Sequence, residues 1–356
     1  MHGHSEAAKP MSDVRYHDSI NVLQEMFGET STETERGTLA TGPFDRPEWF
    51  RLLCDSGLVP LVVGAQSGDK QVALTLAEDN GRIASLRNWY SFTWRPLGDN
   101  STLRANLLRE IAATLKRRAH RVTLEPVPDE DDSARQLCQA FSETGWRVEV
   151  VQCDTNHVQH TAGLDFSDYW AERPGHLRNT LKRKRKLVDV CVTSEFIPTR
   201  WAEYESIYAA SWKPREDYPA MLRAFAEAEA AAGRMRLGLA YHNGHAVAAQ
   251  LWTVEQRTAY IHKLAHLETH KKLSAGTTLT AAMFKQVIER DKVALVDFGT
   301  GDQAYKADWM SHTRPRYRID CLNRKAPRAW WDLAQLTARR LQASEVPMLA
   351  QHPAAV

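Results

Sequence analysis

The clearest pattern of apolar and polar residues lies in the last third of the chain. Residues 258–267 alternate with a period of two and are rich in β-branched and aromatic side chains, which predicts a strand. The period then lengthens, because Leu279, Met283 and Val287 recur at every fourth position, as on one face of an amphipathic helix. Residues 293–298 form a short apolar run. The pattern therefore predicts a strand, a turn, a helix and a second strand.

The first half of the chain also contains alternating segments, after a polar start. Residues 1–40 are rich in Glu, Ser and Thr, so we expect a mobile tail with one short helix around residues 20–27. Regular structure is expected from the helix that Pro47 begins. The runs that predict strands are 58–65, 72–77, 82–87, 121–126 and 146–151, and those that predict helices are 103–118 and 133–144.

Helices and one hairpin are predicted between residue 161 and the segment described first. Asn243-Gly244 is a hairpin turn signal between two alternating runs, residues 235–241 and 246–254. The other predicted strands are 190–197 and 316–322, and the predicted helices are 177–187, 201–212 and 218–232. Residues 326–356 predict a last helix followed by a loose end.

Composition narrows the class of protein. Hydrophobic residues make up 43% of the chain and charged residues 25%, as in globular domains, and no apolar run approaches the roughly 18 residues that span a bilayer. The N-terminus lacks the apolar segment of a secretory signal. The five cysteines are scattered without metal-ligand spacing, so we expect reduced cysteines in a cytoplasmic protein. The net charge of +2 argues against a surface built throughout for nucleic acid.

The turn before the long predicted helix consists of small residues. Ser274 occupies the N-cap position and is followed by Ala275, Gly276, Thr277 and Thr278. Such residues leave the first backbone N–H groups of the helix uncovered, and those groups have no partner within the helix. An anion such as a pyrophosphate is a natural ligand for them. An ordinary capped helix after a loop is the alternative interpretation of this turn.

Taken together, these segments resemble the acyl-CoA-binding core of the GNAT superfamily. The likeness is closer to the acetyltransferases associated with cellulose biosynthesis, the CelD-like branch, and to their relatives in the FemAB-like group. The residues that carry it are Lys263-Leu264-Ala265, Ser274-Ala275-Gly276, Asp297-Phe298-Gly299, Gly301-Asp302 and Tyr305-Lys306. The family usually has Pro where Ala275 stands, but Ala leaves the backbone amides as exposed.

The resemblance implies an α/β (α+β) fold of two tandem GNAT-like lobes, each a mixed, mostly antiparallel sheet flanked by helices. Residues 41–160 would form a degenerate first lobe that shapes the acceptor site, because they lack a turn like that at residues 274–278. Residues 161–325 would form the lobe that binds acetyl-CoA or another acyl-CoA. The enzyme would move the acyl group directly to an amine or hydroxyl of a small or saccharide-linked acceptor, and no metal is expected.

The same resemblance implies which residues hold the cofactor. The strand that contains Lys263, Leu264 and Ala265 would offer backbone groups to the pantetheine chain. Residues 274–278 would hold the pyrophosphate. The acceptor would then attack the thioester directly, so no enzyme nucleophile is required, and the sequence contains no recognisable nucleophile motif.

The catalytic residues implied by the resemblance follow the last strand of the segment. Asp302 would act as the base, with Tyr305 nearby, and Lys306 would bind a phosphate or carboxylate of the acceptor. Simpler roles stay open for each. Asp302 could be a helix N-cap, Lys306 could pair with Asp302, and Asp297 could cap the turn at Gly299.

A basic predicted helix leaves two further functions open. Its basic residues are Arg178, Lys182, Arg183, Lys184, Arg185 and Lys186. A solvated helix face with Leu177 and Leu181 turned inward is the preferred interpretation, and recruitment of a phosphate is a second. The alternatives to acyl transfer from CoA are a FemAB-like aminoacyl transfer from charged tRNA, and a binding module without catalysis that uses this helix.

Two other motifs are set aside. Residues 299–304 fit GxGxxA after a strand, but Pro315 leaves too short a helix for a dinucleotide-binding crossover. Four consecutive acids at residues 129–132 precede a predicted helix, where they favour its N-terminus, so a metal site is the weaker interpretation.

Overall fold

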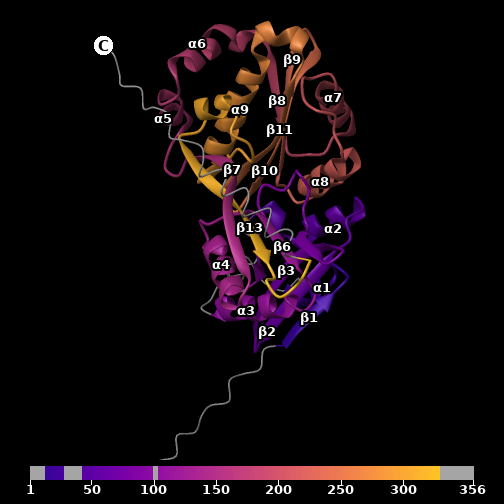
Figure 1. Cartoon of the computed structure of the whole chain (residues 1–356). Coiled ribbons are helices and arrows are strands. Elements are labelled where there is room, and N and C mark those ends of the chain that lie inside the picture. Colours follow the sequence, from indigo (N-terminus) through magenta and orange to yellow (C-terminus); the bar gives the residue numbers. More distant parts are fainter. Residues whose placement is uncertain (1–12, 28–41, 99–102, 329–356) are drawn as a thin grey trace, which may run out of the picture.

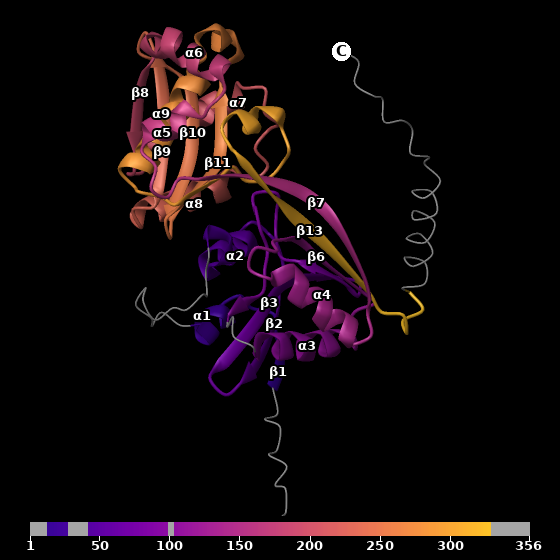
Figure 2. The same ribbon diagram turned by 90° about the vertical axis from the view of Figure 1, so that its left-hand side faces the viewer.

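The computed structural model of the chain describes residues 13–27, 42–98 and 103–328. Their strands form one mixed sheet in the order β1-β2-β3-β4-β6-β13-β7-β12-β11-β10-β9-β8, with the short β5 (Leu97–Gly98) paired to β3. Helices flank this sheet, and the two ends of the strand order form two lobes joined by a long ribbon (Figure 1, Figure 2). The predicted mixed α/β fold with flanking helices is confirmed.

The first lobe consists of an antiparallel meander followed by a helix and a parallel strand. The elements are β1 (Asp13–His17), β2 (Leu61–Ser67), β3 (Lys70–Asp79), β4 (Arg82–Ser85), α3 (Leu103–Leu115) and β6 (Arg121–Val127). β6 runs parallel to β4, and α3 lies in the crossover connection that leads to it. The prediction of a mobile tail before the first helix is wrong for residues 13–17, since β1 pairs with β2. The short helix predicted around residues 20–27 is confirmed as α1 (Val22–Phe27), which buries Leu23.

The second lobe repeats this order of elements. They are β8 (Asp189–Thr193), β9 (Met235–His242), β10 (His245–Glu255), β11 (Thr258–His266), α9 (Ala275–Glu289) and β12 (Leu295–Asp297). β8 to β11 are antiparallel, and β12 returns parallel to β11 after α9. α9 forms where the four-residue period predicts it, with Leu279, Met283 and Val287 fully buried.

The two lobes exchange their last strands. β7 (Arg147–His160) follows the first lobe along the chain, yet its end pairs with β12 of the second lobe. β13 (His312–Leu322) follows the second lobe, yet it pairs with β6 of the first lobe and with β7 along its whole length. Figure 2 shows these two strands as a ribbon between the lobes. The predicted boundaries at residues 160 and 325 therefore need correction, because β13 completes the sheet of the first lobe.

The remaining helices cover the two faces of the sheet. They are α2 (Pro47–Asp55), α4 (Ser133–Glu143), α5 (Phe166–Ala171), α6 (Gly175–Lys184), α7 (Pro198–Ala209) and α8 (Pro219–Ala231), with short 3-10 turns η1 (Pro43–Asp45), η2 (Arg185–Leu187), η3 (Glu268–Leu273) and η4 (Ala304–Asp308). On one face of the second lobe, Trp252 packs with Tyr169 and Phe284. The core on the other face runs on into the first lobe.

Contacts between α2 and α8 fix the lobes against each other. Trp49 and Phe225 meet edge to face with ring centroids 5.3 Å apart. Beside them Arg46, which is half-buried, pairs with the buried Glu229 at 2.6 Å and with Glu255 at 3.4 Å. Since removing one member of a buried charge pair is costly, these contacts hold the lobes in one arrangement.

None of the described helices is both long enough and apolar enough to cross a bilayer. The last predicted helix and loose end, residues 326–356, lie outside the described residues apart from 326–328.

Candidate functional site

Strands β11 and β12 pair over only three residues and then separate. Their register joins Thr258 to Leu295 and ends with Tyr260 opposite Asp297, whereas β11 continues to His266. Beyond Tyr260, within the described part of the chain, no strand pairs with β11 on this side. The pairing of β11 with β10 also shifts here, because Leu251 faces Lys263 while Trp252 faces Ile261, so the strand bulges. The backbone of residues 261–266 therefore has one open edge.

The N-terminus of α9 lies at the far end of that open edge. A Cβ atom at Gly276 would meet the ring of His266 at 3.5 Å, so the last residue of β11 borders the first turn of the helix. Ser274 is the N-cap in a left-handed conformation, with φ 53°, and its side chain does not cap the helix. Among the described residues the N–H groups of Ala275, Gly276 and Thr277 make no backbone or side-chain hydrogen bond, so they remain available to an anion.

The basic helix α6 supplies a cation to the same turn. Lys184 donates to the Ser274 hydroxyl at 3.1 Å and to the Lys272 carbonyl oxygen at 2.7 Å. Leu177 is buried and most other side chains of α6 are exposed or half-buried, as the preferred interpretation predicted. The contact of Lys184 with Ser274 shows in addition that one of the basic residues borders the free amides.

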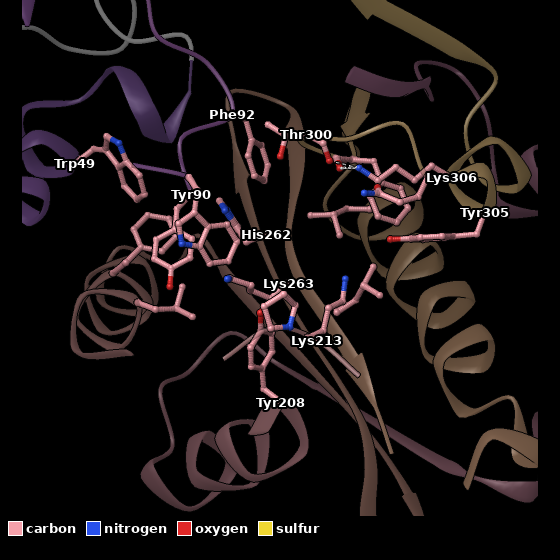
Figure 3. Close-up of a pocket in the computed structure, with 18 residues that line it drawn as sticks. Trp49, Tyr90, Phe92, Tyr208, Lys213, His262, Lys263, Thr300, Tyr305 and Lys306 are labelled. Atoms are coloured by element: carbon pink, nitrogen blue, oxygen red, sulfur yellow. Dashed lines mark hydrogen bonds between the residues drawn. The ribbon is translucent and has the colours of Figure 1, made fainter. Parts of the chain in front are cut away.

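A cavity of about 230 Å³ opens at the other end of the open edge, where β11 leaves β12. Figure 3 shows side chains of both lobes around it. Its lining comes from α2, from the loop after β4, from α7, α8 and the segment between them, from β11, and from the loop after β12. The cavity therefore lies between the lobes at the point where the strands separate.

Lys263 of β11 stands in a cage of aromatic rings at this cavity. Its ammonium group lies 3.7 Å from the centroid of Trp89, 4.1 Å from that of Tyr90 and 5.2 Å from that of Tyr208. Glu216 pairs with it at 2.9 Å. Burial lowers the pKa of Lys263 to about 8, because a charged ammonium group is poorly solvated there, although Glu216 opposes this shift.

Lys306 is held by the loop that follows β12. It is 3% exposed, and it donates to the carbonyl oxygens of Phe298 and Thr300. Burial lowers its pKa to about 8. The predicted alternative, a pair with Asp302, is absent from the ion pairs of the described residues. An ammonium group has three N–H donors, so Lys306 can give one more to a ligand in the cavity.

Asp302 is bonded to a histidine that the sequence did not point to. Its carboxylate lies 2.7 Å from Nε2 of the buried His157, and its side chain is 70% exposed. It does not line the cavity, in contrast to Thr300 and Gln303 on either side. The N-cap of η4 is Gln303, so the capping alternative for Asp302 is wrong.

Asp297 is engaged in structural contacts. Its carboxylate accepts from the Gly299 N–H and from Asn156, each at 2.7 Å, and pairs with Arg314 at 2.9 Å. The interpretation of Asp297 as the cap of the Gly299 turn is confirmed. The buried carboxylate fixes the start of the loop that carries Lys306.

The structure brings only some of the predicted site residues together. Lys263, Leu264, Tyr305 and Lys306 line the cavity, whereas Ala265 is buried in the core. Residues 274–278 lie at the opposite end of β11. The residues that sequence reasoning missed are Trp89, Tyr90, His157, Tyr208, Lys213 and Glu216. Tyr208 lies on the predicted helix 201–212 and Lys213 directly follows that helix, but neither was assigned to the site, and no pattern in the sequence marks the other four.

One protein-family model matches the part of the chain that contains most of this site. Residues 175–307 match the family model of the acetyltransferase (GNAT) domain. The matched range extends from α6 to η4, so it includes β11, α9, β12 and the loop with Lys306. No curated protein matches the sequence.

Solved structures resemble a larger part of the chain than the segment that the family model matches. The structure of FemX superposes with a TM-score of 0.63 at 10% identity, over 91% of this chain and 99% of that one. The structure of L-PGS from Bacillus licheniformis superposes with a TM-score of 0.52 at 11% identity, over 79% of this chain and 91% of that one. At such identities the likeness shows the fold alone.

Proposed function

We propose that this protein transfers an acyl group, acetyl in the simplest case, from acyl-CoA directly to an amine or hydroxyl of a small or saccharide-linked acceptor. The proposal rests on one observation: the open edge of β11 runs from the cavity between the lobes to the free amides of α9. This layout offers a place to the pyrophosphate, the pantetheine arm and the thioester of an acyl-CoA molecule. The likeness of residues 263–265, 274–276 and 297–306 to the CelD-like branch also supports it.

The two ends of β11 would bind two different parts of the donor, the pyrophosphate and the thioester. The pyrophosphate would accept hydrogen bonds from the N–H groups of Ala275, Gly276 and Thr277, with Lys184 as a nearby cation. The pantetheine arm, which has its own amide groups, would pair with the backbone of residues 261–266 as an added strand would. The thioester would then reach the cavity, where acceptor and donor meet.

For direct transfer, the enzyme has to hold the donor and the acceptor in position and to accept a proton from the acceptor. The acceptor nitrogen or oxygen attacks the thioester carbonyl, the bond from carbon to sulfur breaks, and the sulfur leaves as a thiolate that takes up a proton. Backbone N–H groups on the open edge of β11 would stabilise the negative charge on the carbonyl oxygen. Asp302, oriented by His157, would accept the proton from an acceptor that projects from the cavity toward the rim.

Replacing Asp302 by Asn tests its proposed role as the base. Because a well-placed base contributes about 10² to 10⁴ in rate, we expect kcat to fall at least about a hundredfold. The amide oxygen can still accept from His157, so the melting temperature should stay nearly unchanged. A near-normal kcat in this variant would show that Asp302 only orients His157, and Asp302→Ala would then be the variant that lowers the rate.

Isothermal titration with acetyl-CoA tests the proposed function itself. We expect one site per chain, with acetyl-CoA and CoA binding about equally, because the pyrophosphate and pantetheine contacts do not involve the acetyl group. Absence of binding at millimolar acetyl-CoA would reject the proposal.

A FemAB-like transfer from charged tRNA is the second candidate, favoured by the likeness of the fold to FemX. Filter binding of tRNA over a salt series separates this candidate from the first. Tight binding of tRNA, with affinity that falls steeply as salt rises, would support it.

A further inference from the structure

The cavity between the lobes contains more positive than negative charge. Lys213, Lys263 and Lys306 all line it, and no Asp or Glu is among its lining residues. Lys263 is neutralised by Glu216, whereas Lys306 donates only to uncharged carbonyl groups. Lys213 is half-buried and has no carboxylate partner within the described ranges of the chain. Neither Lys213 nor Lys306 therefore has an ion-pair partner among the described residues, although the charges of Asp154, Asp297 and Asp302 act on Lys306 from a greater distance.

Lys213 is the lysine whose charge acts on both of the other lysines of the cavity. Burial lowers its pKa, and its own charge contributes to the lowered pKa values of both Lys263 and Lys306, so it lies within electrostatic reach of the other two. Its one described ring contact is with Trp212, whose centroid lies 5.3 Å from the ammonium group. Since buried charges in proteins are normally paired, a ligand with a negative group would supply what the protein does not.

The walls of the cavity are largely aromatic. The rings that line it belong to Trp49, Trp89, Tyr90, Phe92, Tyr208, Phe225, Phe298 and Tyr305 (Figure 3). Its volume of about 230 Å³ is below the roughly 300–1,000 Å³ of pockets that hold drug-sized ligands. The part of a ligand that enters must therefore be small, and apolar or ring-shaped where it meets these walls.

We infer that the acceptor is a small acid with an apolar, ring-containing body, whose carboxylate or phosphate group lies against Lys213 and Lys306 while the body packs on the aromatic walls. The inference rests on the proposed function, because it names the class of acceptor for the same site. It assigns to Lys213 a role in selecting the acceptor. Lys306 donates its remaining N–H to the acid group of the ligand. Lys263 also lines the cavity, but its charge is balanced by Glu216.

The test compares acids with an uncharged molecule of the same shape. The probes are 3-phenylpropionate, phenyl phosphate and 3-phenylpropanamide, each titrated into the full chain at pH 7 with and without CoA. We expect at least one acid to bind at least tenfold more tightly than the amide, about 1.4 kcal/mol. Phenylpropionate and phenyl phosphate distinguish a carboxylate acceptor from a phosphorylated one.

Lys213→Met is the decisive variant, because it keeps most of the apolar stem and removes the charge. We expect the preference for the acid to disappear while the affinities for the amide and for CoA change less than about twofold. Lys285→Met is the matched control, since Lys285 lies on the outside of α9 with 58% of its side chain exposed. Melting temperatures of both variants verify that they fold.

Each outcome decides between the inference and the function on which it rests. Equal binding of acid and amide, or a preference that survives in Lys213→Met, would overturn the inference. Binding of CoA without binding of any acid would overturn it too, and would leave the acyltransferase proposal standing. Binding of an acid without binding of CoA would uphold the proposed acid-binding site and reject CoA as the donor.

Discussion

Gly276→Glu is expected to abolish CoA binding, with an affinity at least about a hundredfold lower, equivalent to about 2.7 kcal/mol. The new carboxylate would cover the free N–H groups of Ala275 and Thr277 and would repel a pyrophosphate. The fold should remain intact. The nearest atom to a Cβ at Gly276 lies at 3.5 Å, and an acidic residue in the first turn favours a helix. Isothermal titration with CoA and a thermal melt measure both effects.

Gly175→Glu is the control for that experiment. Gly175 also lies in the first turn of a helix, α6, and nothing lies within 4 Å of a Cβ built there. The same charge is therefore added to a helix N-terminus that borders neither β11 nor the cavity, and CoA affinity should not change. Unchanged CoA affinity in a folded Gly276→Glu protein would remove α9 from the proposed site.

Lys306→Met is expected to lower kcat at least about a hundredfold, the loss that follows removal of one donor from a preorganised site. It should also lower the free energy of unfolding by about 1–3 kcal/mol, because the carbonyl groups of Phe298 and Thr300 lose their donor. CoA affinity should hardly change, since the free amides of α9 lie at the opposite end of β11. Single-turnover kinetics, urea unfolding and calorimetry separate the three quantities.

Lys285→Met again provides the control, because it removes an exposed lysine that takes no part in the cavity. A Lys306→Met protein with normal kcat but a lowered free energy of unfolding would show that the amine stabilises the loop and takes no part in the reaction.

The local pattern of apolar residues predicted the helices and strands better than it predicted which strands pair with one another. The strand–helix–strand order around α9 follows from two periods that each element shows by itself. Residues 293–298 looked like one strand, but only Leu295–Asp297 pairs, because β11 and β12 separate where the cavity begins. Residues 13–17 alternate only weakly, and they form a strand because β2 offers an edge.

The candidate site was harder to predict, since long-range contacts build it. The partner of Asp302 is His157, on a strand 145 residues earlier, and no spacing signals such a contact. The aromatic cage of Lys263 comes from both lobes, with Trp89 in the first and Tyr208 in the second. The turn at residues 274–278 was predictable because helix capping is local. The charge of the cavity depends on Lys213, which directly follows the predicted helix 201–212 and belongs to no motif in the sequence.

The exchange of β7 and β13 sets an order for folding during synthesis. When residues 121–127 leave the ribosome, β6 has β4 on one side, but its other neighbour, β13, is nearly 200 residues away in the chain. One edge of β6 therefore stays unpaired until the second lobe has been synthesised, and unpaired strand edges promote aggregation. The last of the described strands closes the first lobe, so a chain interrupted before residue 312 leaves the first lobe without β13 and leaves β7 without its long partner strand.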